Sequence, residues 1–130
     1  SPLALVRDEI DGSFAESSVE AILAALERSG TPFGRKTAET LGSKSPTSLK
    51  VTLRQLREGA RLGFEDCMRL EYRLACRFMR AHDFFEGVRA VVIDKDNQPR
   101  WQPSRLADVT EEQVAAYFEP LPEGELTFDD

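Results

Sequence analysis

Two rows of basic side chains are the first candidates for binding chemistry. Within each row the residues recur at the three- and four-residue intervals that place side chains on one helix face. The rows are Lys50, Arg54, Arg57 and Arg61, and Arg69, Arg73, Arg77 and Arg80. Such a face suits phosphate or an acidic partner. Interleaved acidic residues at ion-pair spacing favour a solvated helix face instead; they are Glu58, Glu65, Asp66 and Glu71.

His82 and Asp83 form the next candidate pair, as a base and the carboxylate that would orient it. Adjacent residues on a helix point in different directions, and no nucleophile or metal-ligand set accompanies them. We therefore expect His82 to lie in the last turn of a helix, where its charge would favour the helix dipole. Glu71 and Glu86 qualify as acid–base groups only in the sense that any glutamate does.

The two cysteines, Cys67 and Cys76, are nine residues apart. On one helix this spacing is about 2.5 turns, which places the thiols on opposite faces and prevents a disulfide between them. A reducing compartment is the simplest interpretation. The sequence also contains no glycine-rich phosphate loop and no Cys/His cluster with metal-ligand spacing. It therefore predicts no catalytic residue, no metal site and no cofactor.

Hydrophobic periodicity and capping residues predict an all-α fold of five or six helices. The predicted helices span residues 17–29, 32–41, 46–58, 64–82, 83–93 and 110–118. Two capping boxes, Ser17 with Glu20 and Thr110 with Gln113, mark helix starts, and Ser45 is a further N-cap. Residues 91–93 have the composition of a strand, but no partner strand is evident, so a helix is favoured.

Composition and charge exclude several classes of protein. The 130 residues fit one domain, and no apolar run approaches the roughly 18 residues that a membrane span needs. Residues 101–130 hold one basic side chain, Arg105, and eight acidic ones, so this segment accounts for the net charge of −6. An acidic balance disfavours nucleic-acid binding. We expect the acidic end to be a solvated surface segment.

Four stretches of sequence carry a family resemblance. They are residues 45–56, which begin Ser45-Pro46-Thr47-Ser48-Leu49-Lys50; residues 71–74, Glu71-Tyr72-Arg73-Leu74; residues 82–96, which end in Asp94-Lys95-Asp96; and residues 99–101, Pro99-Arg100-Trp101. Together they resemble the C-terminal part of 3-hydroxyisobutyryl-CoA hydrolases, a branch of the crotonase (enoyl-CoA hydratase/isomerase) superfamily. The Glu-Gly-x-x-Ala unit at residues 86–90 is shared widely among crotonases, whereas the Ser-Pro-Thr-Ser-Leu-Lys run favours the hydrolase branch.

The resemblance implies a domain and a role for it. Family members hydrolyse an acyl-CoA thioester in valine breakdown, and their N-terminal spiral core, absent from these residues, supplies the oxyanion hole and the catalytic acidic groups. The chain would then be a C-terminal helical domain, with amphipathic helices in 1–44, a hydrolase-like helical core in 45–101, and a capped short helix and acidic tail in 102–130. The resemblance assigns no catalytic residue here; it implies contact with the CoA nucleotide near Val91 and Lys95.

The resemblance also implies partners and a location. The partners would be the N-terminal crotonase core of the same enzyme, a second copy in a homo-oligomer, and acyl-CoA as substrate, with neither nucleic acid nor membrane. The location would be cytoplasmic, or the mitochondrial matrix in a eukaryote. Two alternatives stay open: the C-terminal part of an enoyl-CoA hydratase or isomerase, and a stand-alone helical interaction module.

Overall fold

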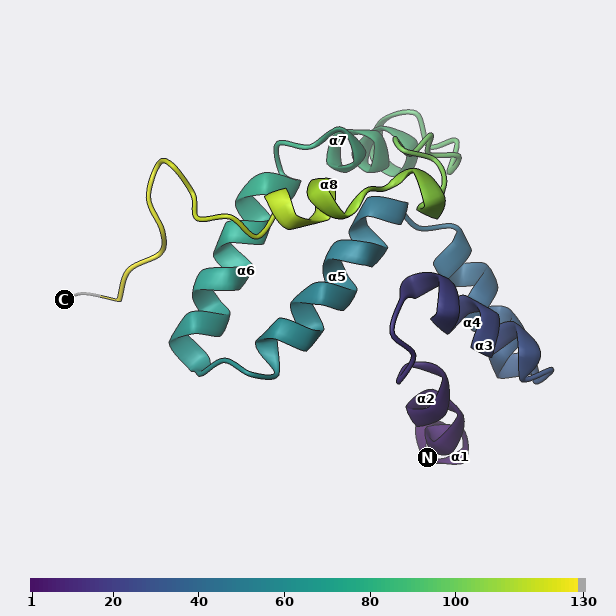
Figure 1. Ribbon diagram of the computed structural model, residues 1–130. Helices are drawn as coiled ribbons and strands as arrows, with labels where there is room; N and C mark the ends of the chain where they lie inside the picture. The colour runs from purple at the N-terminus through teal and green to yellow at the C-terminus, as the bar shows by residue number, and fades with distance from the viewer. Residues whose placement is uncertain (129–130) are drawn as a thin grey trace. The chain divides into compact units, whose positions relative to one another are not determined.

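A computed structural model describes residues 1–128 of the chain, and every regular element within them is helical (Figure 1). The all-α prediction is confirmed. Eight α-helices occur among these residues, together with one π-helix and one 3-10 helix. The additional helices are α1 (Pro2–Leu5) and α2 (Arg7–Ser13), which the sequence patterns did not indicate. The chain divides into two compact units, an N-terminal unit of Ser1–Lys44 and a C-terminal unit of Ser45–Asp130.

In the N-terminal unit, α3 (Val19–Arg28) packs against α4 (Pro32–Gly42). Val19, Ile22 and Leu26 of α3 are buried, as their helical spacing predicts. The N-cap of α3 is Ser18 rather than Ser17, because the Ser18 hydroxyl accepts the Ala21 amide at 3.0 Å. The Ser17–Glu20 capping box is therefore wrong by one residue, an error typical of helix boundaries read from sequence.

The C-terminal unit is built around α5 (Pro46–Gly59), which packs against both α6 (Phe64–Phe78) and α8 (Glu111–Ala116) (Figure 1). Its core combines residues from these three helices with two from the flanking loops: Val51, Leu70, Leu74, Val109, Val114 and Phe118. Burying one such side chain contributes about 1.5–3 kcal/mol. Residues far apart in the sequence therefore share one core.

The predicted long helix over 64–82 ends early. α6 stops at Phe78, and Ala81 adopts an extended conformation (φ −90°, ψ 155°) before α7 (His82–Val88) begins. A π-helix, Arg89–Ile93, follows α7 directly, so the prediction of helix rather than strand over 91–93 is confirmed. The chain then turns back in a loop, passes through a 3-10 helix (Leu106–Asp108), and reaches α8.

Candidate functional site

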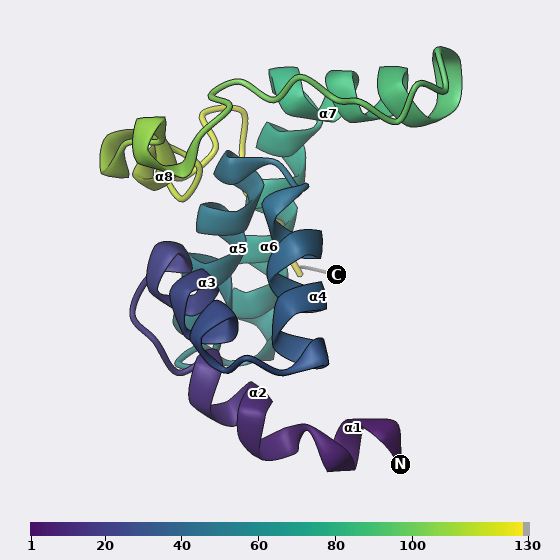
Figure 2. The ribbon, with the colours of Figure 1, turned by 90° about the vertical axis from the view of Figure 1, so that its right-hand side faces the viewer.

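The loop that follows the π-helix runs back along α7 (Figure 2). Three backbone amides of the loop bind this helical arm: Asn97 N donates to the Ala90 carbonyl at 2.9 Å, Arg100 N to Glu86 Oε2 at 2.8 Å, and Gln102 N to Asp83 Oδ1 at 2.9 Å. The loop is therefore tied along its length to α7 and the π-helix.

The Trp101 ring of this loop packs over Gly87 of α7. A Cβ atom built at Gly87 would lie 3.5 Å from Cη2 of the Trp101 ring, which covers this position. An alanine methyl group would just touch the indole, whereas a longer side chain at Gly87 would push the indole away from the helix. The glycine of the Glu-Gly-x-x-Ala unit thus serves the packing of the returning loop.

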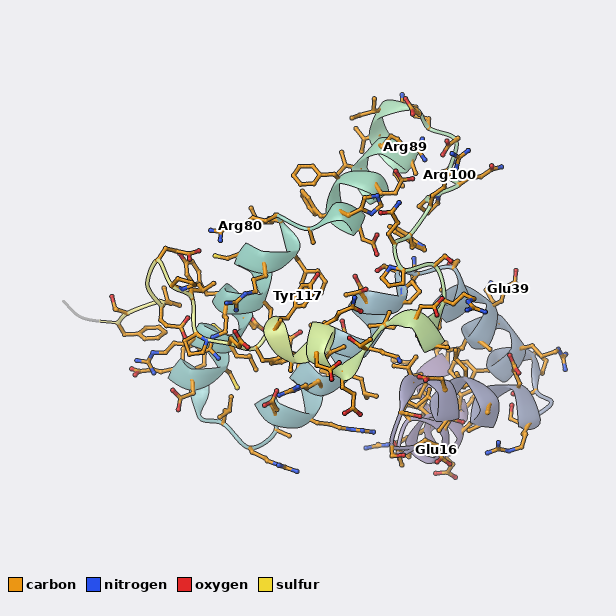
Figure 3. The ribbon with its side chains drawn as sticks, turned by 45° about the horizontal axis from the view of Figure 1, so that its top comes forward. Glu16, Glu39, Arg80, Arg89, Arg100 and Tyr117 are labelled. Atoms are coloured by element: carbon orange, nitrogen blue, oxygen red, sulfur yellow. The ribbon has the colours of Figure 1, made fainter. Side chains whose placement is uncertain are left out.

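Arg89 lies at the centre of this arrangement (Figure 3). Its guanidinium donates to both oxygens of Glu86, from Nε at 2.9 Å and from Nη2 at 2.6 Å. Nη1 donates to Asp94 and Asp96, each at 2.8 Å. One planar cation therefore joins a carboxylate of α7 to two carboxylates of the loop, in the bidentate geometry that makes arginine–carboxylate pairs strong.

The same contacts fix the charge states of the carboxylates. Hydrogen bonds from Arg89 and from the Arg100 amide lower the pKa of Glu86 to about 2. The Arg89 guanidinium and the Gln98 amide lower the pKa of Asp96 as well. Glu86 therefore stays ionised near neutral pH and has no proton to donate. Its low pKa also makes it a weak proton acceptor, and both of its oxygens are already bound by Arg89 and by the Arg100 amide, so it serves as a structural anion.

Both residues that the resemblance assigned to ligand contact lie on this arm. Val91 is on the π-helix with 60% of its surface exposed. Lys95 is exposed in the loop, between the two aspartates that Arg89 holds, and has a left-handed backbone (φ 56°). The structure thus brings Val91 and Lys95 to one end of the arm. Arg89 itself was missed, although its position three residues after Glu86 is an ion-pair spacing.

His82 and Asp83 do contact each other, contrary to expectation: His82 Nδ1 lies 2.9 Å from Asp83 Oδ1. His82 also begins α7 instead of ending a helix, so its predicted favourable place on a helix dipole is wrong. The cause is tertiary, because the Asp83 carboxylate also accepts the Ser45 hydroxyl at 2.5 Å and the Gln102 amide.

This group of three residues has the wrong order for a nucleophilic triad. In such triads the histidine stands between the serine and the carboxylate, so that it can remove the hydroxyl proton. Here Asp83 stands between Ser45 and His82, and the Ser45 hydroxyl also caps α5 by accepting the Ser48 amide at 3.2 Å. The cluster therefore joins α5 to α7 and activates no nucleophile.

The cysteines and the possible metal ligands form no further site among the described residues. Cys67 and Cys76 are free thiols, and a hydrogen bond with Cys76 raises the pKa of Tyr72. Within residues 1–128, no group of three or more His, Cys, Asp or Glu side chains is placed to hold a metal ion. Over the same residues, no helix has both the length and the apolar character needed to cross a bilayer.

The second basic row, on α6, binds the acidic end of its own chain. We call residues 117–126 the C-terminal segment. Arg73 Nη1 donates to the Phe118 carbonyl at 2.6 Å, and Arg77 Nη1 to the Tyr117 carbonyl at 3.0 Å. Arg69 Nε reaches the Leu126 carbonyl at 3.3 Å. Arg80, labelled in Figure 3, is the one member of the row that lies beyond α6, two residues after Phe78.

Carboxylates of the C-terminal segment complete these contacts. Arg73 pairs with Glu125, and Arg80 pairs with Glu123 at 2.6 Å. The predictions of a solvated helix face and a solvated acidic end are therefore wrong for this part of the chain, since the two surfaces bind each other. Asp129 and Asp130, the last residues of the predicted acidic tail, lie outside the described residues.

The first basic row, on α5, makes contacts both within its own helix and with distant parts of the chain. Lys50 Nζ donates to the Leu106 carbonyl at 2.8 Å, which ties α5 to the 3-10 helix. Arg54 makes the predicted ion pair with Glu58 at 3.1 Å, and its guanidinium also lies 4.5 Å from the Phe118 ring centroid. On α6, the interleaved Asp66 pairs with Arg69 at 2.8 Å, as expected. The ion-pair spacing is thus confirmed for Glu58, Glu65 and Asp66, whereas Glu71 makes no ion pair within residues 1–128.

Comparison with known proteins covers almost the whole chain. The family model for enoyl-CoA hydratase/isomerase matches residues 1–118. The mitochondrial 3-hydroxyisobutyryl-CoA hydrolase of Gallus gallus is 49% identical over 119 residues, which are 92% of this chain and 31% of that protein. The Homo sapiens protein of the same name is 44% identical over 121 residues, 93% of this chain and 31% of that protein. The chain thus spans about a third of the length of these relatives.

Two solved structures are similar over the same range. A carnitinyl-CoA dehydratase from Mycobacterium thermoresistibile has a TM-score of 0.92 and 41% identity, and the match covers 99% of this chain and 37% of that one. An enoyl-CoA hydratase from Rhodobacter sphaeroides has a TM-score of 0.89 and 38% identity, covering 98% and 38%. The sequence and fold matches agree, and the chain belongs to the enoyl-CoA hydratase/isomerase family, the crotonase superfamily.

Proposed function

We propose that this chain is the helical C-terminal part of an enzyme similar to 3-hydroxyisobutyryl-CoA hydrolase, which hydrolyses an acyl-CoA thioester in valine breakdown. The observation that carries this proposal is its identity of 44% to 50% with curated hydrolases across about 92% of its length. The relatives named mitochondrial support a place in the mitochondrial matrix if the source is eukaryotic, and in the cytoplasm otherwise.

In this proposal the chain contributes binding surface and not the reacting groups. Hydrolysis of a thioester needs an oxyanion hole and a carboxylate that assists the attack of water. The arrangement of Glu86 and of the Ser45–Asp83–His82 cluster supplies neither. Both would come from the other two-thirds of the relatives' length, so we infer that this chain alone releases no CoA.

The apolar surface of α7 and the π-helix supports a role in docking. Five large apolar side chains there have 44% to 70% of their surface exposed: Phe84, Phe85, Val91, Val92 and Ile93. A patch of this kind on a soluble protein typically marks an interface. We propose that it covers the N-terminal core of the enzyme, or a second copy in a homo-oligomer. Residues Val91 and Lys95 at the end of this arm would then reach bound acyl-CoA, where the Lys95 ammonium suits a phosphate.

A thiol-release assay on 3-hydroxyisobutyryl-CoA tests the proposal. It is run in parallel on the 130-residue chain and on the full-length protein. We expect free CoA from the full-length protein alone. CoA release by the 130-residue chain would contradict the assignment of the reacting groups to the rest of the enzyme. A short chain that unfolds cooperatively and is monodisperse, with no affinity for CoA thioesters or for a crotonase core, would indicate a stand-alone module.

The alternative reaction is the hydration or isomerisation of an enoyl-CoA. It is favoured by the two similar solved structures, which are named a dehydratase and a hydratase and are 41% and 38% identical to this chain. Product analysis separates the reactions, because hydrolysis releases a thiol whereas hydration consumes the enoyl double bond and leaves the thioester intact. Loss of the enoyl absorbance without thiol release would replace the hydrolase assignment.

A further inference from the structure

We propose that Arg89 is a positioning residue that holds residues 94–98 in their turn and thereby fixes Lys95 for an anionic ligand. This inference rests on the proposed contact between Lys95 and a phosphate of CoA. Arg89 does not itself touch the ligand in this proposal. It acts through the loop, and the loop carries the lysine.

The contacts of Arg89 enclose Lys95 on both sides along the chain. The guanidinium is anchored to α7 by both oxygens of Glu86, whose side chain is only 12% exposed. From this anchor it binds the residues directly before and after Lys95, Asp94 and Asp96, and it also reaches the Gln98 carbonyl at 3.4 Å. The backbone of Lys95 is therefore held between two tethered neighbours, while its own side chain is left exposed.

The backbone of this loop needs such support. Lys95 and Asn97 both have left-handed conformations, with φ values of 56° and 54°. This region costs free energy for residues other than glycine and persists where surrounding contacts enforce it. Two further hydrogen bonds assist Arg89: Asn97 N to the Ala90 carbonyl, and Gln98 N to Asp96 Oδ1 at 2.8 Å. Without the guanidinium, the two aspartates would lose their common partner and repel each other.

Lysine cannot replace arginine here. The three nitrogens of the Arg89 guanidinium reach four groups: the carboxylates of Glu86, Asp94 and Asp96, and the Gln98 carbonyl. An ammonium is a compact point charge with three donors and lacks that reach. The Arg89→Lys variant therefore keeps the charge but loses the geometry, whereas Arg89→Gln loses both. Comparing the two variants separates positioning from the simple neutralisation of three carboxylates.

The test uses the full-length protein and four variants: R89K, R89Q, K95Q and the double variant R89Q/K95Q. The measurements are KM and kcat for the acyl-CoA ester, the Kd for CoA by calorimetry, and hydrogen exchange of the amides in 94–98. The matched control is Arg105→Gln, because within residues 1–128 Arg105 pairs only with Asp108 at 2.9 Å, across the 3-10 helix that Arg105 caps. We expect R89K and R89Q to raise KM and Kd about tenfold, the effect of losing one charge-assisted contact, with kcat nearly unchanged.

Three results decide the matter. Exchange in 94–98 should quicken in R89K and R89Q but not in R105Q, and the double variant should bind CoA no more weakly than K95Q, because both changes remove one contact. Unchanged exchange in R89K, or a KM of R89K equal to that of the unaltered protein, would overturn the positioning role. Unchanged KM and Kd in K95Q would overturn the proposed phosphate contact and the ligand role of Arg89 with it, even where the exchange data show that Arg89 holds the loop.

Discussion

Arginine organises two regions of the C-terminal unit in opposite ways. At the Arg89 loop, one guanidinium joins three carboxylates that lie within seven residues of it in sequence. On α6, several guanidinium groups bind one segment from 40 or more residues away, mostly through its main-chain carbonyls. The first arrangement is local and depends on acidic side chains, whereas the second is long-range and depends on backbone shape.

The two regions should therefore respond differently to the loss of one arginine. If Arg89 is lost, three carboxylates lose one shared partner at once, so the effect concentrates in a single short loop. On α6, when one arginine is lost, the neighbouring arginines keep their bonds to other carbonyls. The start of the C-terminal segment also stays anchored by Phe118, a core residue that is 8% exposed. The α6 contacts should therefore be separable, and the Arg89 contacts should not.

The largest expected effect concerns the apolar packing between α6 and the start of the C-terminal segment. Leu74 is 2% exposed, within the core that includes Phe118. Leu74→Ala should lower the free energy of unfolding by about 2–5 kcal/mol, because it leaves a cavity in a close-packed core. Chemical denaturation measures this loss. Leu56→Ala on α5, where the side chain is 67% exposed, is the control and should change stability little. Equal losses in both variants would mean that the described core is wrong.

The next effect isolates one arginine of α6. Arg73 binds the Phe118 carbonyl and Glu125, and its side chain is 21% exposed. Arg73→Ala should cost about 1–2 kcal/mol, since it removes charge-assisted hydrogen bonds to partly buried groups. It should also speed proteolysis within residues 119–126. Arg61→Ala is the charge-matched control, because no ion pair of Arg61 occurs within residues 1–128. Equal proteolysis in the two variants would show that net charge, and not these bonds, holds the segment.

The sequence indicated the local part of this architecture well. The Ser45 cap and the Thr110–Gln113 capping box are confirmed, the latter with both hydrogen bonds formed, because each depends on residues three positions apart. The α3 face of Val19, Ile22 and Leu26 is buried as its spacing predicts. Periodicity and capping depend on neighbours, so a single sequence contains the information they need.

Long-range contacts were outside the reach of the sequence patterns. Nothing local indicates that Asp83 accepts a hydrogen bond from Ser45, 38 residues earlier, or that α6 ends at Phe78 so that α7 can form. Glu125 binds Arg73 from 52 residues away, although both side chains were expected to be solvated. Arg89 lies between these cases, because its pair with Glu86 has a recognisable spacing but its bonds to the two aspartates depend on the turn.

A smaller effect concerns pH. The pKa of Glu86 is about 2 in the folded protein, below the usual value for glutamate. A carboxyl group with a lowered folded pKa stabilises the protein above its unfolded pKa and loses that contribution as the pH falls through the folded value. The Arg89 loop should therefore loosen between about pH 4.5 and pH 2, as amide exchange in 94–98 would record. Glu86→Gln should remove this part of the pH dependence, and an unaltered pH profile in that variant would contradict the Arg89–Glu86 pair.

The smallest effect compares an exposed ion pair of α6 with a partly buried one. Glu65 lies 3.7 Å from Arg69 and is 62% exposed, whereas Glu125 on Arg73 is 26% exposed. Exposed pairs at this spacing contribute about 0.3–0.5 kcal/mol and weaken with salt. Glu65→Gln should therefore change the unfolding midpoint by less than Glu125→Gln, and the difference should persist at high salt, because the Glu125 contact is partly shielded from water. If the two variants lose equal stability at every salt concentration, the α6 row behaves as the solvated face that its charge pattern first indicated, and the C-terminal segment is held by its apolar residues alone.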